Sequence, residues 1–232
     1  MKKIFNEILM TISFLSRIPA GGTGEIKKIP RYFTIVGYLS GLLYMILTAI
    51  MGKGVFQVVL TMVVAFFFFD LFHFDGLLDT LDGFLNQNKE KRLEIMSKGD
   101  TGPFAMFYGI VFIGTFFYCL TQADSLMLLY SGVFSRFTMN VVLNLSKPVK
   151  KTGLGALFYP YDSRNSLIAL LITLPLLANP KFFLISFALS VLCGTTMHLI
   201  AKKQIGGYTG DVLGASCLIS NLFIMISLIL IK

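Results

Sequence analysis

Charged residues are scarce in this 232-residue chain. Asp, Glu, Lys and Arg make up 14% of it, whereas they approach about 25% of an ordinary soluble domain. Hydrophobic residues make up 55%, and the mean hydropathy is +0.77. This composition excludes an independent soluble domain and predicts an integral membrane protein. The length accommodates about seven spans of roughly 20 residues, so we expect a single membrane-embedded domain over 1–232.

Cysteine is also scarce. Cys119, Cys193 and Cys217 all lie in apolar runs, with neither a CxxC pair nor a Cys/His cluster. This pattern is typical of small core side chains and argues against a disulfide framework or a zinc site. Tandem repeats and low-complexity linkers are likewise absent apart from one run of phenylalanines, which we interpret as lipid-facing or packed in the core.

The N-terminal segment lacks the features of a cleaved signal peptide. Asn6 and Glu7 interrupt its apolar stretch, and no Ala-x-Ala-like site follows. Residues 2–17 instead place apolar side chains along one stripe, which predicts an amphipathic helix lying in the membrane interface. We expect 1–31 to form this helix and a loop, and 33–231 to form a transmembrane bundle.

The remaining apolar runs predict an all-α polytopic bundle of about seven transmembrane helices. The predicted spans are 33–51, 55–74, 104–121, 125–143, 165–178, 182–200 and 211–231. The fifth is short and contains Pro175, so we expect it to be kinked, tilted or partly re-entrant.

Positive charge is distributed unevenly over the connections between these spans. Connections on one side carry 16 Lys and Arg residues, and those on the other side carry 3. The positive-inside rule therefore predicts a cytoplasmic N-terminus and an external C-terminus in a prokaryotic cytoplasmic membrane. The same rule explains the net charge of +8 without nucleic-acid binding. It also places 75–103, 146–164 and 201–210 together on the cytoplasmic side.

An acidic motif follows the second span. Asp75, Asp79 and Asp82 stand at i, i+4 and i+7, which puts them within roughly 60° of one another on a helix. A carboxylate deep in a membrane costs about 2.5–3.5 kcal/mol, so three of them need a counter-charge. The pattern predicts that all three are catalytic ligands of Mg²⁺, or of Mn²⁺, holding a substrate phosphate. Gly76 and Gly83 would let substrate approach the backbone. The alternative is a solvated helix end.

Two further polar residues lie in apolar surroundings. Arg136 falls inside a predicted span, where its guanidinium must face a polar cavity or a carboxylate. A substrate diphosphate is one partner, and a structural ion pair with Asp70 is the other. His73 lies on nearly the opposite helical face from the acidic motif, so we expect a structural hydrogen bond there rather than metal ligation.

The loops contain five more candidate substrate-binding residues. Gly207, Thr209 and Asp211 belong to a glycine-rich turn before the last span, where backbone N–H groups can hold phosphate. Simple helix capping explains the same residues equally well. Lys98 and Arg17 are candidates for binding phosphate or anionic lipid.

Several ordered motifs resemble the cobalamin synthase family, whose activity is adenosylcobinamide-GDP ribazoletransferase. They are FLSRIP at Phe14–Pro19, HFDGLLDTLDGF at His73–Phe84, RLEIM at Arg92–Met96, TGLG at Thr152–Gly155 and GGYTGDVLGA at Gly206–Ala215. The chain departs from the family pattern at Ser97–Gly102, where an acid and a base have changed places. It departs again at Leu218 and Asn221, where family members usually carry carboxylates.

The resemblance implies a membrane phosphotransferase. It would join adenosylcobinamide-GDP to α-ribazole, or to α-ribazole 5′-phosphate, and release GMP in the last step of nucleotide-loop assembly. The resemblance also leaves open a homo-oligomer or association with other cobalamin-assembly enzymes. A CDP-alcohol-type phosphotransferase is an alternative, but its Asp-Gly-x-x-Ala-Arg opening is missing. A cation or corrinoid transporter is another, although the acids cluster at one end rather than through the bilayer.

Overall fold

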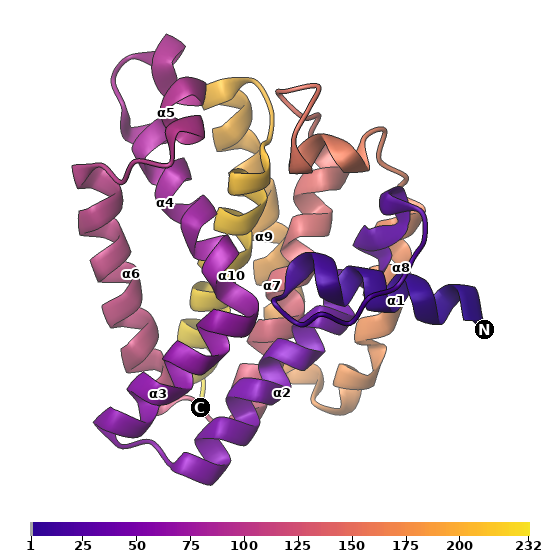
Figure 1. Ribbon diagram of the computed structural model, residues 1–232. Helices are drawn as coiled ribbons and strands as arrows, with labels where there is room; N and C mark the ends of the chain where they lie inside the picture. Colours follow the sequence, from indigo (N-terminus) through magenta and orange to yellow (C-terminus); the bar gives the residue numbers. More distant parts are fainter. Residues whose placement is uncertain (1) are drawn as a thin grey trace.

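The computed structural model describes residues 2–232 as a bundle of ten α-helices, which confirms the all-α prediction (Figure 1). The α-helices are α1 (Lys2–Leu15), α2 (Phe33–Met51), α3 (Val55–Ala65), α4 (Leu71–Leu85), α5 (Arg92–Lys98), α6 (Pro103–Gln122), α7 (Ser125–Leu145), α8 (Arg164–Thr173), α9 (Pro180–Ile205) and α10 (Gly210–Leu230). Shorter 3-10 helices are η1 (Ile26–Tyr32), η3 (Lys89–Lys91), η4 (Leu154–Phe158) and η5 (Leu174–Ala178), and η2 (Phe66–Asp70) is a π-helical turn.

Within the described residues, six helical stretches are long and apolar enough to cross a membrane, against the predicted seven. The missing one is the fifth span, because Pro175 lies in the 3-10 segment η5 and ends α8 after 10 residues. Together α8 and η5 extend roughly 25 Å, short of the roughly 30 Å hydrocarbon core. In Figure 1 they lie beside α1 and lead down to the start of α9, so the predicted order of elements is kept.

Helix α1 lies across the bundle rather than along it, as predicted for an amphipathic interfacial helix (Figure 1). It ends at Leu15, two residues before the predicted boundary. The buried carboxylate of Glu7 accepts a hydrogen bond of 3.1 Å from the Tyr32 hydroxyl. The Thr11 hydroxyl donates to the carbonyl of Ile29 over 3.4 Å. These bonds fix α1 to η1.

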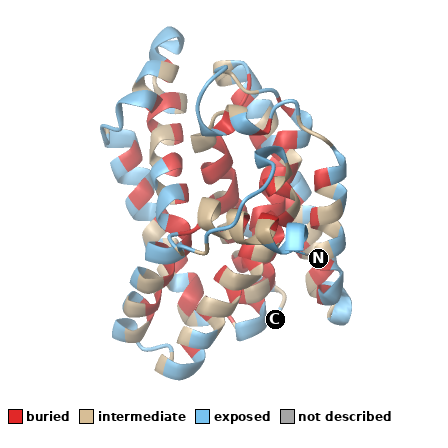
Figure 2. Ribbon diagram, turned by 45° about the vertical axis from the view of Figure 1, so that its right-hand side comes forward, coloured by how far each residue is buried: buried red, intermediate tan, exposed pale blue. Residues whose placement is uncertain are grey.

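Helices α2, α7 and α10 form the centre of the bundle, where the buried residues gather (Figure 2). A Gly-x-x-x-Gly pair, Gly37 and Gly41, brings α2 against Gly132 of α7. A Cβ atom on Gly37 would lie 2.6 Å from the Gly132 carbonyl oxygen, so side chains are excluded at this crossing. Small residues serve membrane helices in this way because lipid provides no hydrophobic drive for association. All three cysteines are free, as predicted.

The helix that carries the acidic motif is interrupted by the π-helical turn η2. The stretch Val55–Leu85 is otherwise continuous over 31 residues, longer than the predicted 55–74 span. Within the turn, Phe66 and Phe69 are buried and Phe67 and Phe68 are exposed, so the phenylalanine run serves both core and lipid. π turns often bend helices and lie near functional sites.

The ends of the bundle provide a test of orientation. Arg92 donates to the side-chain oxygen of Gln204 over 2.5 Å, so the connections 86–102 and 205–210 lie at one end. We predict that cysteines placed at Asn88 and Ile205, in a variant whose native cysteines are replaced by serine, react with an impermeant maleimide from the cytoplasmic face. A cysteine at Lys53, at the other end, is the control and should react from outside. Labelling of positions 88 and 205 from opposite faces would refute this orientation.

Candidate active site

Helix α4 brings its acidic residues to different depths in the structure. Asp75 is exposed, Asp79 is half-buried and Asp82 is 6% exposed. The Asp82 carboxylate accepts hydrogen bonds from the backbone N–H groups of Gly102 (2.5 Å) and Ala105 (2.9 Å) at the N-terminus of α6. It therefore caps α6, since carboxylates satisfy the free N–H groups and the positive dipole end of a helix.

A third carboxylate, Asp211, joins Asp75 and Asp79 from the first turn of α10. Gly76 makes this possible, because a Cβ atom there would lie 2.8 Å from the Asp211 Cα atom. Asp211 is half-buried, and its carboxylate accepts a 3.1 Å hydrogen bond from the Thr209 hydroxyl. Asp75, Asp211 and Asp82 all lie close enough to Asp79 to repel its charge. The acidic group of the structure thus spans two helices.

The glycine-rich turn before α10 pairs with the loop that follows α7. Tyr208 donates its N–H to the Lys147 carbonyl over 3.0 Å, and Val149 returns a 3.0 Å bond to the Tyr208 carbonyl. Gly207 is required here because any side chain would collide with the Lys147 carbonyl. Gly207 is therefore a close-packing position, and the phosphate contact expected of it does not follow from its surroundings. Thr209 caps α10 by accepting from the Val212 N–H over 3.3 Å, the alternative left open by the sequence.

The Thr152–Gly155 loop meets the same turn. The Tyr208 hydroxyl donates to the Gly155 carbonyl over 3.0 Å. Burial raises the pKa of Tyr208 to about 12, so the phenol keeps this proton at neutral pH. A Cβ atom on Gly155 would lie 3.0 Å from the Gly210 nitrogen. The predicted convergence of the acidic motif and these two loops at one end of the bundle is confirmed.

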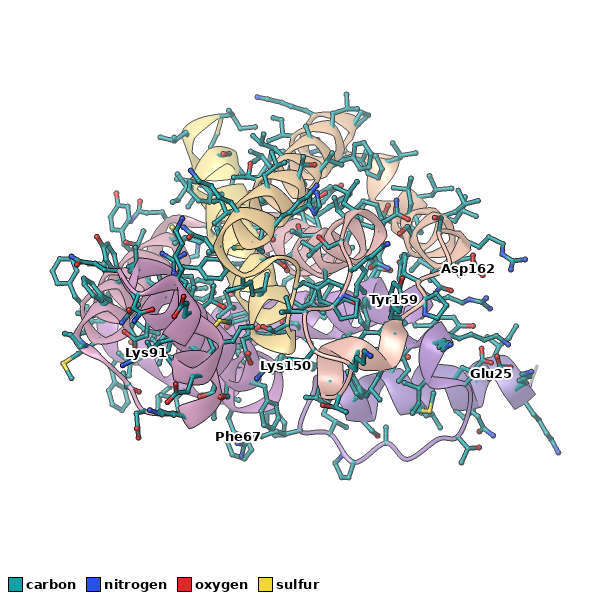
Figure 3. All side chains as sticks on the ribbon, turned by 90° about the horizontal axis from the view of Figure 1, so that it is seen from above. Glu25, Phe67, Lys91, Lys150, Tyr159 and Asp162 are labelled. Atoms are coloured by element: carbon teal, nitrogen blue, oxygen red, sulfur yellow. The ribbon has the colours of Figure 1, made fainter. Side chains whose placement is uncertain are left out.

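These segments enclose a cavity of about 410 Å³. Its lining combines residues of α1, α2, α4, α5, α7, α10 and the 148–158 loop; the polar members include Asp75, Lys150, Thr152, Thr209 and Asp211. Lys150 and Asp211 line the same cavity, and Figure 3 shows Lys150 near the middle of this end of the molecule. The sequence analysis missed Lys150 because it lies in a loop of several lysines, with no motif to distinguish it.

His73 lies in the cavity wall, but its side chain makes a hydrogen bond to the preceding turn of its own helical stretch. Its Nδ1 atom lies 3.0 Å from the Phe69 carbonyl oxygen, and the side chain is buried. The predicted structural hydrogen bond is confirmed. The backbone of His73 also lies against α10, since a Cβ atom on Gly214 would be 3.0 Å from the His73 Cα atom.

Arg136 lies away from the cavity, and its expected diphosphate contact requires correction. Its guanidinium forms an ion pair with Asp70 over 2.6 Å, and both side chains are 0% exposed. Tyr44 donates a second hydrogen bond, of 3.0 Å, to the Asp70 carboxylate. Because a charge inside the membrane domain requires a partner, the structure selects the Asp70 alternative and closes Arg136 to substrate.

Arg17 and Lys98 also lie outside the cavity lining. The Arg17 guanidinium carbon sits 4.9 Å from the ring centre of Phe67 and 5.0 Å from that of Phe72, in an open groove beside the cavity. Lys98 pairs with Glu94 over 2.8 Å, and both side chains are more than half exposed. This hydrogen bond raises the pKa of Lys98 and lowers that of Glu94. The substrate contacts expected of Arg17 and Lys98 thus have no support in the cavity's geometry.

Across residues 2–232, no group of three or more His, Cys, Asp or Glu side chains forms a ready-made metal cage. Asp75, Asp79 and Asp211 nevertheless take part in none of the ion pairs found in that range. The cavity therefore places unpaired negative charge beside a lysine. That arrangement suits a cation and an anionic group bound together.

Comparisons with known proteins all point to one family of proteins. A sequence model described as cobalamin-5-phosphate synthase matches residues 7–229. A protein of Kosmotoga olearia named adenosylcobinamide-GDP ribazoletransferase is 47% identical over 98% of this chain and 100% of its own length. Proteins with the same name from Fervidobacterium nodosum (47%, covering 98% of each chain) and Clostridium botulinum (31%, covering 93% of this chain and 94% of the relative) are also similar. No solved structure matches.

The Asp70–Arg136 pair predicts a specific pattern of stability. Arg136→Met should lower the free energy of unfolding by about 3–5 kcal/mol, because it leaves the Asp70 charge buried without a partner. The double variant Asp70→Leu/Arg136→Met should recover most of that loss. Arg164→Met is the matched control, since its pair with Asp162 is exposed and solvent screening should leave it little effect on stability. Denaturation in detergent measures all three, and equal losses for Arg136→Met and Arg164→Met would contradict a sealed pair.

Proposed function

This chain belongs to the cobalamin-5-phosphate synthase family, and on that premise we propose that the cavity between α4 and α10 is its active site. The enzyme is an adenosylcobinamide-GDP ribazoletransferase, which makes adenosylcobalamin, or its phosphate, and GMP at the end of cobalamin assembly. Nothing in the comparisons favours a CDP-alcohol phosphotransferase or a transporter. The observation that carries the proposal is the unpaired acidic group beside Lys150.

The reaction is a phosphoryl transfer. A ribose hydroxyl of the acceptor forms a new bond to the phosphorus that bears the cobinamide. The bond from that phosphorus to the oxygen of GMP breaks, GMP leaves with the electron pair, and the hydroxyl proton passes to a base or to water. The protein's part in such a transfer is mainly positioning and electrostatic stabilisation.

The residues of the cavity suit this task. Lys150 supplies a positive charge for the diphosphate and for the charge that develops on GMP. Asp75 and Asp211, which line the cavity, and Asp79 one turn along α4 from Asp75 orient the hydroxyl, with the backbone of Gly155 and Gly210 alongside. Asp82 keeps α6 in place behind them rather than touching substrate. We thus replace the predicted trio on α4 with a trio drawn from α4 and α10.

The donor set fits Mg²⁺ or Mn²⁺. Hard divalent cations take oxygen ligands, and Mg²⁺ in particular is held by one or two carboxylates while substrate phosphates and water complete its shell. Asp75, Asp79 and Asp211 would hold it, although these side chains form no ready-made three-residue cage within the described residues. When bound, the ion would neutralise diphosphate charge and polarise the phosphorus.

We place this site at the cytoplasmic surface of the membrane. Asp82 marks the level of the N-terminus of α6, a helix whose 20 residues span about 30 Å alone. Asp79 and Asp75 lie one and two turns further along α4 towards the membrane. The lysine-rich loops around them belong inside by the positive-inside rule. Water-soluble nucleotides thus reach the acids without crossing the bilayer.

Metal dependence gives the first activity test. Asp79→Asn should reduce GMP release at least about 100-fold while the protein still folds, because it removes a metal ligand. Asp82→Asn is the matched control, because Asn also caps helices well, and most activity should remain. GMP release in purified protein, with Mg²⁺ and then with excess EDTA, is the measurement. Full turnover in EDTA would eliminate the metal role.

Substitution of Lys150 gives the second activity test. Lys150→Met should raise the KM for adenosylcobinamide-GDP about 10–100-fold, as expected for loss of one charged hydrogen bond to phosphate. Lys151→Met removes a neighbouring exposed lysine that does not line the cavity and should leave this KM unchanged. Initial rates over a range of donor concentrations decide it. Equal effects of the two variants would mean that loop charge, rather than Lys150 itself, matters.

A further inference from the structure

The cavity wall has an aromatic part made by three distant segments. Phe158 of η4 packs edge-on against Phe14 of α1, with ring centres 5.5 Å apart, and against Phe33 of α2, at 5.8 Å. Phe33 and Phe158 are almost fully buried. Met139 and Leu213 extend this apolar lining. None of these five side chains offers a hydrogen-bond donor or a strong acceptor to a ligand.

The polar part of the same wall is one helical turn away. Residues at i and i+3 of a 3-10 helix lie on one side, separated by about 6 Å of rise. In η4 these positions are Gly155 and Phe158, both in the lining. Gly155 lies against the N-terminus of α10, beside Asp211, whereas Phe158 lies among the aromatic rings. The cavity therefore changes from charged to aromatic over a distance comparable to the length of a nucleoside.

We propose that this cavity is the acceptor subsite, holding the nucleoside with its apolar two-ring base against the wall formed by Phe14, Phe33 and Phe158. The ribose then points to Asp75, Asp211 and Lys150. This inference rests on the proposed function. Beyond that function, it identifies the acceptor as the substrate that the cavity encloses. It also identifies the base of the acceptor as the part that the aromatic wall recognises.

Size supports the assignment. A volume of about 410 Å³ lies in the range of small-molecule sites. A corrin ring with its amide side chains and adenosyl group is far too large for it. The corrinoid donor must therefore stay outside and present only its diphosphate to Lys150 and the acids.

Polarity distinguishes the acceptor base from the guanine of the donor. Guanine has several hydrogen-bonding groups, which would be left unsatisfied against phenylalanine rings. The base of α-ribazole is dimethylbenzimidazole, which has methyl groups on its outer edge and no exocyclic amine. Its burial against aromatic rings is therefore favourable. The wall thus selects benzimidazole-type nucleosides over purine nucleosides.

Phe14→Ala tests the subsite. It should raise the KM for α-ribazole at least about tenfold and change the KM for adenosylcobinamide-GDP by less than about twofold. Phe182→Ala is the matched control, since Phe182 is also half-buried with one edge-on partner, Tyr130 at 5.7 Å, but lies outside the cavity. It should change neither constant. Phe14→Leu, a milder variant, should give a smaller shift in the same direction.

A second measurement separates the subsite from the reaction. Calorimetry of α-ribazole with wild-type protein in lipid nanodiscs, without donor, should show binding that weakens in Phe14→Ala. Adenosine should bind at least about tenfold more weakly than α-ribazole to wild type, and this preference should shrink in the variant. A shift in donor KM alone, or unchanged α-ribazole binding in folded Phe14→Ala, would overturn the subsite. Absence of GMP release in wild type would overturn the proposed function, while the calorimetry would still judge the cavity.

Discussion

The close crossing of α4 and α10 is the constraint on which the rest of the site depends. Gly76 lies against Asp211 and Gly214 lies against His73, with no room for a Cβ atom at its usual distance in either place. Small residues on both helices permit this approach, as is common in membrane proteins. The consequence is electrostatic, because the crossing gathers carboxylates that repel one another. Packing must hold them together, and in the proposed function a cation and a phosphate would offset this repulsion.

The two ends of α4 are fixed in different ways. At its start, Asp70 is held by Arg136 and Tyr44 in the core of the bundle. Near its far end, Asp82 caps α6 through two backbone N–H groups. Asp75 and Asp79 lie between these anchors and are left without partners of their own. A helix fixed at both ends can hold unpaired charge in position, and preorganisation of that kind is what phosphoryl transfer demands of a protein.

Much of this arrangement could be predicted from the sequence, because hydropathy, loop charge and motif order are local signals. They predicted the helical bundle, the N-terminal amphipathic helix and the meeting of three motif loops. The partners of individual side chains were not predictable in this way. Helical spacing grouped Asp82 with Asp75 and Asp79, but spacing carries no information about α6, whose free N–H groups Asp82 satisfies. Asp211 joins the acidic group through a glycine contact, and a loop pairing brings the segment that contains Lys150 to the same turn. Only the folded chain reveals either contact. For Arg136 the sequence left two partners open, a substrate diphosphate and Asp70. The folded chain buries Arg136 and Asp70 together as an ion pair.

The central claim is that carboxylates of α4 and α10 act as one site for a cation. The most direct test is the affinity for Mn²⁺, measured by electron paramagnetic resonance in the presence of adenosylcobinamide-GDP. Wild type, Asp79→Asn, Asp211→Asn and the double variant complete the cycle. If both residues serve one ion, each single substitution should weaken binding and the double variant should be weaker by less than the product of the two losses. Losses that multiply independently, or wild-type affinity in Asp211→Asn, would contradict a shared site.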